Sequence, residues 1–327
     1  MFSHFPLHVF QEFLLSWYEK NKRDLPWRKL EFRGKSQGIR NLRDPYRILV
    51  SELMLQQTQV TRVTPKLEGF LLKWPTIQAL ADAPLSDVLV EWKGLGYNRR
   101  AKHLLETAKI VVHSYDGAFP SDLKTLSSLP GFGSYMISAL RVFAFGKQEP
   151  VVDVNVARVI GRVQALELQV RNPIDPQMRE LAEQSIPNGK ADVWHQALMD
   201  FGSSICTSRK PKCSVCPLSR ICRANKLAKA QGFEDFSQWL DVQPKLKKES
   251  KKDKGKKFEE TDRYFRGRII DFLREGKRSM EELHTYIHND HHLEDRKRFG
   301  SLIEQLVIDG LIVVRGNTVG LVGSLDE

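Results

Sequence analysis

All four cysteines of this 327-residue chain lie within residues 206–222, where they are spaced to act together as metal ligands. Their pattern is Cys206-x6-Cys213-x2-Cys216-x5-Cys222. Disulfides are disfavoured in a chain without a secretory signal. Four thiolates with unequal spacing favour a [4Fe–4S] cluster, which takes one sulfur at each corner of its cube. Structural zinc, which usually shows two close cysteine pairs, and a chance grouping are the alternatives.

Two acidic residues in apolar surroundings are candidates for acid–base chemistry. Glu52 lies in a helical pattern, with Ile48 and Leu49 one turn before it and Leu55 one turn after. Burial would raise the pKa of this carboxyl and keep it protonated near neutrality, as a general acid requires; a structural ion pair is the alternative. Asp153 stands among valines just before a helical pattern. It is either a second catalytic carboxylate or an ordinary helix N-cap.

Two short segments have the composition of phosphate-binding sites. Residues 129–133, Leu-Pro-Gly-Phe-Gly, separate two helical patterns, and Gly131 and Gly133 allow a tight hairpin whose free N–H groups open the next helix. Such N–H groups bind phosphate oxygens without reading base sequence. The loop between the first two cysteines carries Arg209 and Lys210. A cluster would hold this loop against DNA as a cationic finger; a solvated loop is the alternative.

Helical periodicity runs through the chain to about residue 230 and predicts an all-α region there. Amphipathic patterns punctuated by Pro and Gly cover 7–22, 46–63, 76–83, 86–92, 99–115, 121–128, 134–145, 155–165, 176–185 and 191–204. A long polar, basic loop is expected over 29–43. No alternation of strands with these helices is visible, which disfavours a parallel α/β fold.

The last part of the chain, residues 262–327, predicts a small α+β domain. Three amphipathic helices follow one another, and the second is opened by a capping box from Ser279 to Glu282. Two short apolar runs then flank Arg315-Gly316-Asn317, which is typical of a β-hairpin. This order looks like a winged helix whose third helix, from Asp295 to Asp309, would enter a major groove. A protein-interaction module of the same shape is the alternative, and its partner is unknown.

The net charge of +11 is concentrated in one short stretch. Residues 245–257 carry eight lysines against two acidic residues and supply +6 of the total. Because the stretch has no apolar face, we expect 231–261 to be a flexible linker, either a solvated tether or a phosphate-neutralising arm. The positive sign favours a nucleic-acid partner, and a mean hydropathy of −0.39 predicts no membrane span. The N-terminus resembles no signal or transit segment, so we expect an intracellular protein.

The hairpin, the aspartate 20 residues after it and the cysteine spacing together resemble the endonuclease III superfamily of helix-hairpin-helix DNA glycosylases. Within it, five motifs resemble the MutY adenine glycosylases: Asp-Leu-Pro-Trp-Arg at 24–28, Asp-Pro-Tyr at 44–46, Ser-Glu-Leu-Met-Leu-Gln-Gln-Thr-Gln-Val at 51–60, Gly-Leu-Gly-Tyr at 94–97 and Ala-Leu-Met-Asp at 197–200. The resemblance covers residues 7 to about 225.

This resemblance implies a two-lobed glycosylase domain over 1–230. A six-helix lobe would cover about 44–155, and the N-terminal helix with 156–225 would form the iron–sulfur lobe. MutY enzymes usually continue into a MutT-like domain that recognises 8-oxoguanine. Here the Lys-rich linker and the winged-helix-like domain occupy that place.

The implied activity is hydrolysis of the N-glycosidic bond of adenine mispaired with 8-oxoguanine or guanine, after the nucleotide is flipped out of the duplex. Glu52 matches the general acid that protonates the base. Asp153 matches the carboxylate that stabilises or traps the sugar cation. Asn155 and Tyr135 match residues that orient these groups. Because lyases of the superfamily carry Lys where this chain has Tyr135, we expect a monofunctional enzyme.

The resemblance also assigns contacts to double-stranded DNA carrying a mispaired or damaged base. Gln56, Gln57 and Tyr97 match residues inserted into the base stack, and Arg28 and Gln196 match residues that read the adenine edge. The implied binding set is Arg28, Gln56, Gln57, Thr58, Leu95, Tyr97, Gly131, Gly133, Gln196, Arg209 and Lys210. A thymine/uracil mismatch glycosylase and a non-catalytic DNA-binding protein are the alternatives. We expect a monomer.

Overall fold

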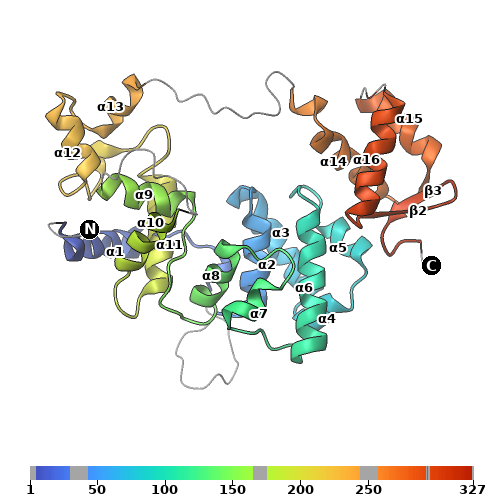
Figure 1. The fold of residues 1–327 in the computed structure, drawn as a ribbon, viewed down its shortest axis with the longest axis horizontal. Helices are drawn as coiled ribbons and strands as arrows, with labels where there is room; N and C mark the ends of the chain where they lie inside the picture. The colour runs from blue at the N-terminus through green and yellow to red at the C-terminus, as the bar shows by residue number, and fades with distance from the viewer. Residues whose placement is uncertain are drawn as a thin grey trace. The chain divides into compact units, whose positions relative to one another are not determined.

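The computed structural model describes residues 5–29, 43–164, 175–243, 257–291, 293 and 295–325. Nearly all of the predicted basic loop at 29–43 and of the Lys-rich run at 245–257 lies outside these residues. The described chain is helical apart from one small antiparallel sheet near the C-terminus (Figure 1). This confirms the predicted all-α core with a small α+β domain after it. Among the described helices, none is long and apolar enough to cross a membrane.

The chain divides into two compact units. The first comprises residues 1–45 and 133–247, and the second comprises 46–132 and 248–327. Helices of the first unit are α1 (Leu7–Asn21), η1 (Pro26–Arg28), α8 (Ser134–Phe143), α9 (Val154–Gln164), α10 (Pro176–Gln184), α11 (Ala191–Ser204), η2 (Cys213–Val215), α12 (Arg223–Ala230) and α13 (Phe236–Val242). Those of the second are α2 (Pro45–Leu55), α3 (Val60–Lys73), α4 (Ile77–Ala81), α5 (Leu85–Glu91), α6 (Arg99–Tyr115) and α7 (Leu123–Ser127), followed by the C-terminal domain.

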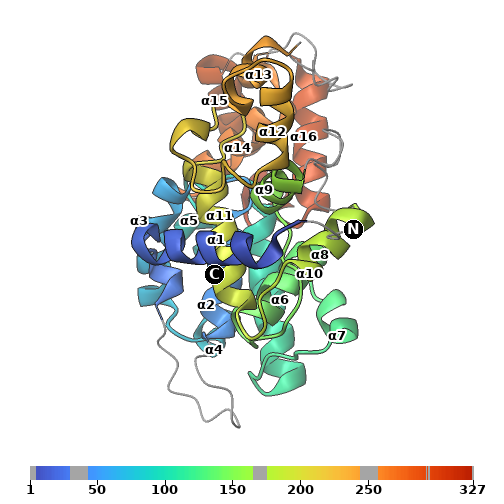
Figure 2. The ribbon, with the colours of Figure 1, turned by 90° about the vertical axis from the view of Figure 1, so that its left-hand side faces the viewer.

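The core of the first unit forms where α1 and α9 pack against α11 (Figure 2). Phe10 of α1 is fully buried and meets Trp194 of α11 edge to face, with ring centroids 5.0 Å apart. Val156 and Ile160 of α9 are buried in the same cluster. Helix α11 is thus held in place by apolar neighbours, and this packing sets the positions of the polar side chains on the same helix.

The predicted helix over 46–63 is wrong, because the chain turns in its middle. Helix α2 ends at Leu55 and α3 begins at Val60. Between them Gln57 adopts a left-handed backbone conformation with φ of 59°, which no α-helix can contain. The segment 56–59 is therefore a turn between two helices, in which Gln57 and Gln59 are exposed.

The C-terminal domain has the predicted helix order and a sheet with one more strand than the expected hairpin. Its elements are η3 (Phe258–Glu260), α14 (Asp262–Leu273), β1 (Arg278–Ser279), α15 (Met280–His291), α16 (Arg296–Ile308), β2 (Ile312–Arg315) and β3 (Thr318–Leu321). The strand order is β1-β3-β2, all antiparallel. The capping box is confirmed: the Ser279 N–H donates to Glu282 Oε2 (2.7 Å), and the Glu282 N–H donates to Ser279 Oγ (3.1 Å).

Helix α13 lies inside the stretch 231–261 that composition predicts to be a linker. Asp235 caps it through the N–H groups of Ser237 and Gln238. Phe236 is buried against α12 and stacks on Trp239 at 5.3 Å. These two aromatic residues provide the apolar surface that orders the segment, so the chain remains packed through about residue 243.

Candidate active site and iron–sulfur centre

The hairpin at 129–133 connects α7 to α8 and presents both of its glycines to the surface. Gly131 has φ of 80°, and a Cβ there would approach His103 to 3.1 Å, so only glycine fits this turn without strain. Thr107 Oγ1 donates to the Pro130 carbonyl (3.1 Å) and ties the hairpin to α6. Gly133 occupies the N-cap position of α8. The exposed start of α8 therefore has the geometry of an anion site.

Asp153 caps α9, and its carboxylate is held on both oxygens. Its Oδ1 accepts from the backbone N–H groups of Asn155 (2.8 Å) and Val156 (2.7 Å), and its Oδ2 accepts from the Asn155 side-chain amide (2.7 Å). Asn155 Oδ1 accepts in turn from Arg158 Nη2 (2.7 Å), and Arg158 Nε donates to the Cys206 carbonyl (2.7 Å). The carboxylate thus lies oriented at the positive end of a helix dipole.

His195 supports the segment that leads into Asp153, although no sequence motif marks this histidine. It is fully buried in α11. Its Nε2 accepts from the Val151 N–H (3.0 Å), and its Nδ1 lies 2.6 Å from the Ala191 carbonyl, so Nδ1 carries the proton. Burial lowers the pKa of His195 to about 4, which keeps the ring neutral. A neutral histidine is the form that can accept from one N–H while donating to a carbonyl.

The structure places the two candidate carboxylates in different units. Glu52 lies in α2 with only 7% of its surface exposed, as its apolar neighbours predicted. It belongs to the unit containing 46–132. The unit containing 133–247 carries Asp153 and Asn155. It also carries Tyr135, which is half-buried in the first turn of α8.

Arg28 and Gln196 are each engaged by another side chain. The Arg28 guanidinium forms a two-pronged ion pair with Asp200 of α11, with Nη1–Oδ2 and Nη2–Oδ1 distances of 2.7 and 2.9 Å. Arg23 contacts the same carboxylate. Burial raises the pKa of Asp200, but the bonds from Arg28 and Arg23 outweigh it and hold this pKa below its usual value. Gln196 Oε1 accepts from the Tyr18 hydroxyl (3.0 Å).

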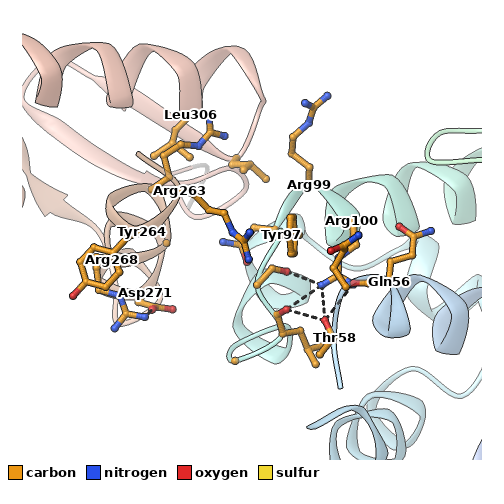
Figure 3. A pocket seen from close by; sticks show the side chains of 18 of the residues that line it. Gln56, Thr58, Tyr97, Arg99, Arg100, Arg263, Tyr264, Arg268, Asp271 and Leu306 are labelled. Atoms are coloured by element: carbon orange, nitrogen blue, oxygen red, sulfur yellow. Dashed lines mark hydrogen bonds and ion pairs between the residues drawn. The ribbon is translucent and has the colours of Figure 1, made fainter. Parts of the chain in front are cut away.

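A buried arginine that the sequence did not single out joins the two turns predicted to enter the base stack. Arg100 of α6 is 7% exposed, and Figure 3 shows its guanidinium between these turns. It donates to the carbonyls of Leu53 (2.6 Å), Met54 (3.0 Å), Gln56, Leu95 (3.0 Å) and Gly96 (3.0 Å) and to Thr58 Oγ1 (3.1 Å). Burial lowers its pKa to about 10, so it stays charged near neutrality.

The turns that Arg100 joins carry the predicted inserting residues, which differ in exposure. Gln57 is exposed, Gln56 is half-buried and Tyr97 is 39% exposed. Tyr97 has φ of 48°, so both Gln57 and Tyr97 hold a left-handed conformation that L-residues adopt at a cost. Arg100 thus stabilises two strained loop tips side by side.

All four cysteines line one small pocket. Burial, together with the charges of neighbouring thiols, raises the pKa of Cys213 and Cys216 to about 12. A donor set of four thiols around one pocket fits the four corners of a [4Fe–4S] cube. Iron binding at this site would release the thiol protons.

The loop between the first two cysteines is held from behind by a second buried arginine. Arg162 of α9 donates to the carbonyls of Thr207 (2.7 Å) and Ser208 (2.8 Å) and lies 3.4 Å from Cys206 Sγ. Arg209 and Lys210 at the tip of the loop are exposed. The tip therefore presents two cations on a fixed base.

Two family models match this chain. Residues 50–187 match the HhH-GPD superfamily of base excision DNA repair proteins. Residues 206–222, which contain all four cysteines, match the iron-sulfur binding domain of endonuclease III. The prediction of an iron–sulfur cluster is therefore confirmed, and zinc is disfavoured.

Several curated relatives are similar over most of the chain, and all are named adenine DNA glycosylase. That of Mycolicibacterium smegmatis is 35% identical over 300 residues, 91% of each chain. That of Mycobacterium tuberculosis is 35% identical over 82% of this chain and 80% of the relative. The Homo sapiens relative is 41% identical over 67% of this chain, which is 40% of that longer protein.

Solved structures share the fold of the glycosylase region. A thermostable thymine-DNA glycosylase is 33% identical with a TM-score of 0.60, covering 68% of this chain and 97% of that one. A complex of endonuclease III with DNA covers 68% of this chain and 98% of the other chain, with a TM-score of 0.55. At 20% identity it supports the fold alone.

Proposed function

We propose that this chain, which belongs to the family of adenine DNA glycosylases, hydrolyses the N-glycosidic bond of adenine mispaired with 8-oxoguanine or guanine in double-stranded DNA. The predicted resemblance to that family is confirmed by the 35% identity across 91% of a curated member. The observation that carries the proposal is Asp153, whose carboxylate is fixed by three hydrogen bonds at the start of α9. Such a preorganised anion stabilises developing positive charge without reorganising.

The reaction divides between two carboxyl groups. Glu52, buried in α2, donates a proton to adenine N7 and makes the base a neutral leaving group as the C1′–N9 bond breaks. Asp153 stabilises the resulting sugar cation or bonds to it covalently, and water then completes hydrolysis. Because three N–H groups fix the Asp153 carboxylate, its distance to the sugar is set by α9 rather than by side-chain rotation.

Recognition of adenine is assigned to Gln196. The Tyr18 hydroxyl donates to its Oε1, which orients the amide and leaves its N–H groups as donors. Burial raises the pKa of Tyr18, so this hydroxyl keeps its proton. A fixed amide can exchange paired hydrogen bonds with the adenine edge. Arg28, whose two Nη atoms bind Asp200, acts as a positioning residue for this region.

The remaining predicted residues serve binding. Cys206, Cys213, Cys216 and Cys222 hold the [4Fe–4S] cluster, which supplies a rigid cross-link for the basic loop. Arg209 and Lys210 on that loop and the hairpin glycines contact phosphates. Tyr135 has no amine for Schiff-base chemistry, so abasic DNA is released without strong strand cleavage.

The proposal is tested with end-labelled duplexes containing A·8-oxoguanine, A·guanine, T·guanine and U·guanine, each treated with alkali after incubation. We expect alkali-dependent cleavage at adenine only. The Asp153→Asn variant keeps an oxygen that can cap α9 and should bind DNA but not cleave it. Glu52→Gln should behave likewise. Cleavage by either variant at the wild-type rate would refute the mechanism.

A second function is supported by one specific observation. The thymine-DNA glycosylase is 33% identical to this chain, and the match covers 97% of that glycosylase. Cleavage at T or U but not at A in the same panel would establish this function instead. The amide of Gln196 favours adenine.

A further inference from the structure

A large cleft in the second unit is shared by the glycosylase lobe and the C-terminal domain. Its volume is about 1060 Å³. On one side it is lined by the turns carrying Gln57 and Tyr97 and by Gly131 of the hairpin. On the other side it is lined by α14 of the C-terminal domain. Three elements assigned to DNA contact therefore share one cleft with an element that the family resemblance does not cover.

Arg263 brings α14 into direct contact with this surface. It lies in the first turn of α14, and its guanidinium lies over the Tyr97 ring, 4.1 Å from the centroid (Figure 3). Tyr97 still has 39% of its surface exposed. The arginine therefore supports the ring from one side without enclosing it.

The other arginines of α14 and its C-cap that line the cleft are each paired with a carboxylate, whereas Arg263 is not. The ion pairs are Arg266 with Asp309, and Arg268 and Arg274 with Asp271. Within the described part of the chain, Arg263 has no carboxylate partner, and its guanidinium lies over the rings of Tyr97 and Phe258. A guanidinium stacked through its face keeps its in-plane N–H donors for another acceptor.

Specific bonds hold α14 in this place. Arg274, whose side chain is 5% exposed, donates from Nε to the Leu89 carbonyl (2.8 Å) and from Nη2 to Asn98 Oδ1 (3.0 Å). Lys102 of α6 donates to the Asp309 carbonyl (2.8 Å). Asn98 is the residue next to Tyr97. The domain is therefore bonded to the same turn that Arg263 contacts.

We propose that α14 is a DNA-backbone contact of this enzyme, in which Arg263 supports Tyr97 and donates to a phosphodiester of the strand that passes through the cleft. The inference rests on the proposed function, since it assumes that Tyr97 enters the duplex. It differs from the expectation that α16 reads a major groove. Arg298 at the start of α16 is bound to Asp262 and to the Glu260 carbonyl.

The test is the salt dependence of binding to a labelled duplex, measured by fluorescence anisotropy for the full chain and for Arg263→Ala. One lost phosphate contact lowers the slope of log Kd against log salt by about 0.9 and weakens binding about eightfold near 0.1 M salt. Lys277→Ala is the control, because Lys277 is an exposed cation of the same domain that does not line the cleft. It should leave the slope unchanged. Arg263→Lys should keep most of the slope.

Three outcomes would overturn the proposal. Weaker binding with an unchanged slope would mean that Arg263 only supports Tyr97. Tighter binding or faster excision by Arg263→Ala would mean that α14 covers Tyr97 and inhibits the enzyme. An effect confined to duplexes with 8-oxoguanine would indicate base reading. The salt slope reports binding and does not depend on excision. If the wild-type protein excised no adenine but Arg263→Ala still lowered the slope, the proposed function would be refuted and the backbone contact would stand.

Discussion

His195 should make the stability of this protein depend on pH in a defined window. The ring is fully buried, is neutral and bridges the Val151 N–H and the Ala191 carbonyl. Protonation would place a second N–H opposite the Val151 donor inside an apolar core. The folded state therefore resists protonation, and the pKa of His195 falls from 6.5 to about 4.

The size and sign of the effect follow from proton linkage. A folded pKa below the unfolded one contributes stability that is complete about one pH unit above 6.5 and is lost as the pH falls through 6.5 towards 4. With these two values, the free energy of unfolding should drop by about 1.3 kcal/mol between about pH 7.5 and 5.5. At the lower end of this pH window, His195 is still unprotonated in the folded protein.

The assay is urea unfolding followed by circular dichroism at several pH values, with visible absorbance recorded to show that the cluster stays bound. His195→Gln keeps a donor and an acceptor but cannot titrate. Between about pH 7.5 and 5.5, the change in its free energy of unfolding should therefore be smaller than that of the wild type by about 1.3 kcal/mol. His113→Gln, at an exposed position of α6, is the control and should match the wild type. An equal pH dependence in His195→Gln and in the wild type would refute the reasoning.

Two further predictions concern Arg100 and the cysteines. Arg100→Met leaves buried carbonyls without donors and should lower the free energy of unfolding by about 3 kcal/mol or more. It should slow single-turnover excision more than it weakens duplex binding. Arg100→Lys should partly restore both stability and excision. Excision and stability at wild-type levels would contradict the role given to Arg100. Cys216→Ser should lose visible absorbance and bound iron and weaken DNA binding, because the Arg209 loop loses its anchor. A wild-type preparation that is colourless and contains zinc would contradict the cluster itself.

Features encoded locally were predictable from the sequence. Helices such as α6 and α11 follow from apolar residues at helical spacing, and the Ser279 capping box follows from two residues three apart. The turn after Leu55 was missed because the apolar pattern continues through it; the break depends on the backbone conformation of Gln57. Helix α13 was missed because composition averaged over a Lys-rich region hides Phe236 and Trp239.

Contacts between distant residues were not predictable. The sequence shows Asp200 only as part of a motif, and its bond to Arg28 joins positions 172 residues apart. His195 and Arg100 carry no local signal, because a histidine or an arginine in a helix is more often exposed than buried. What the family resemblance supplied was the set of reacting groups. What only the structure supplied was the set of residues that hold them.

The buried arginines change what the charge of +11 means for DNA binding. Arg28 is bound by Asp200, Arg100 by loop carbonyls and Arg162 by the cysteine loop. Each of these cations is directed inward and stabilises a segment assigned to the site, so it cannot also release a counter-ion from DNA. Phosphate contact is left to exposed groups such as Arg209 and Arg263. The salt dependence of binding should therefore follow these few exposed cations and not the total charge.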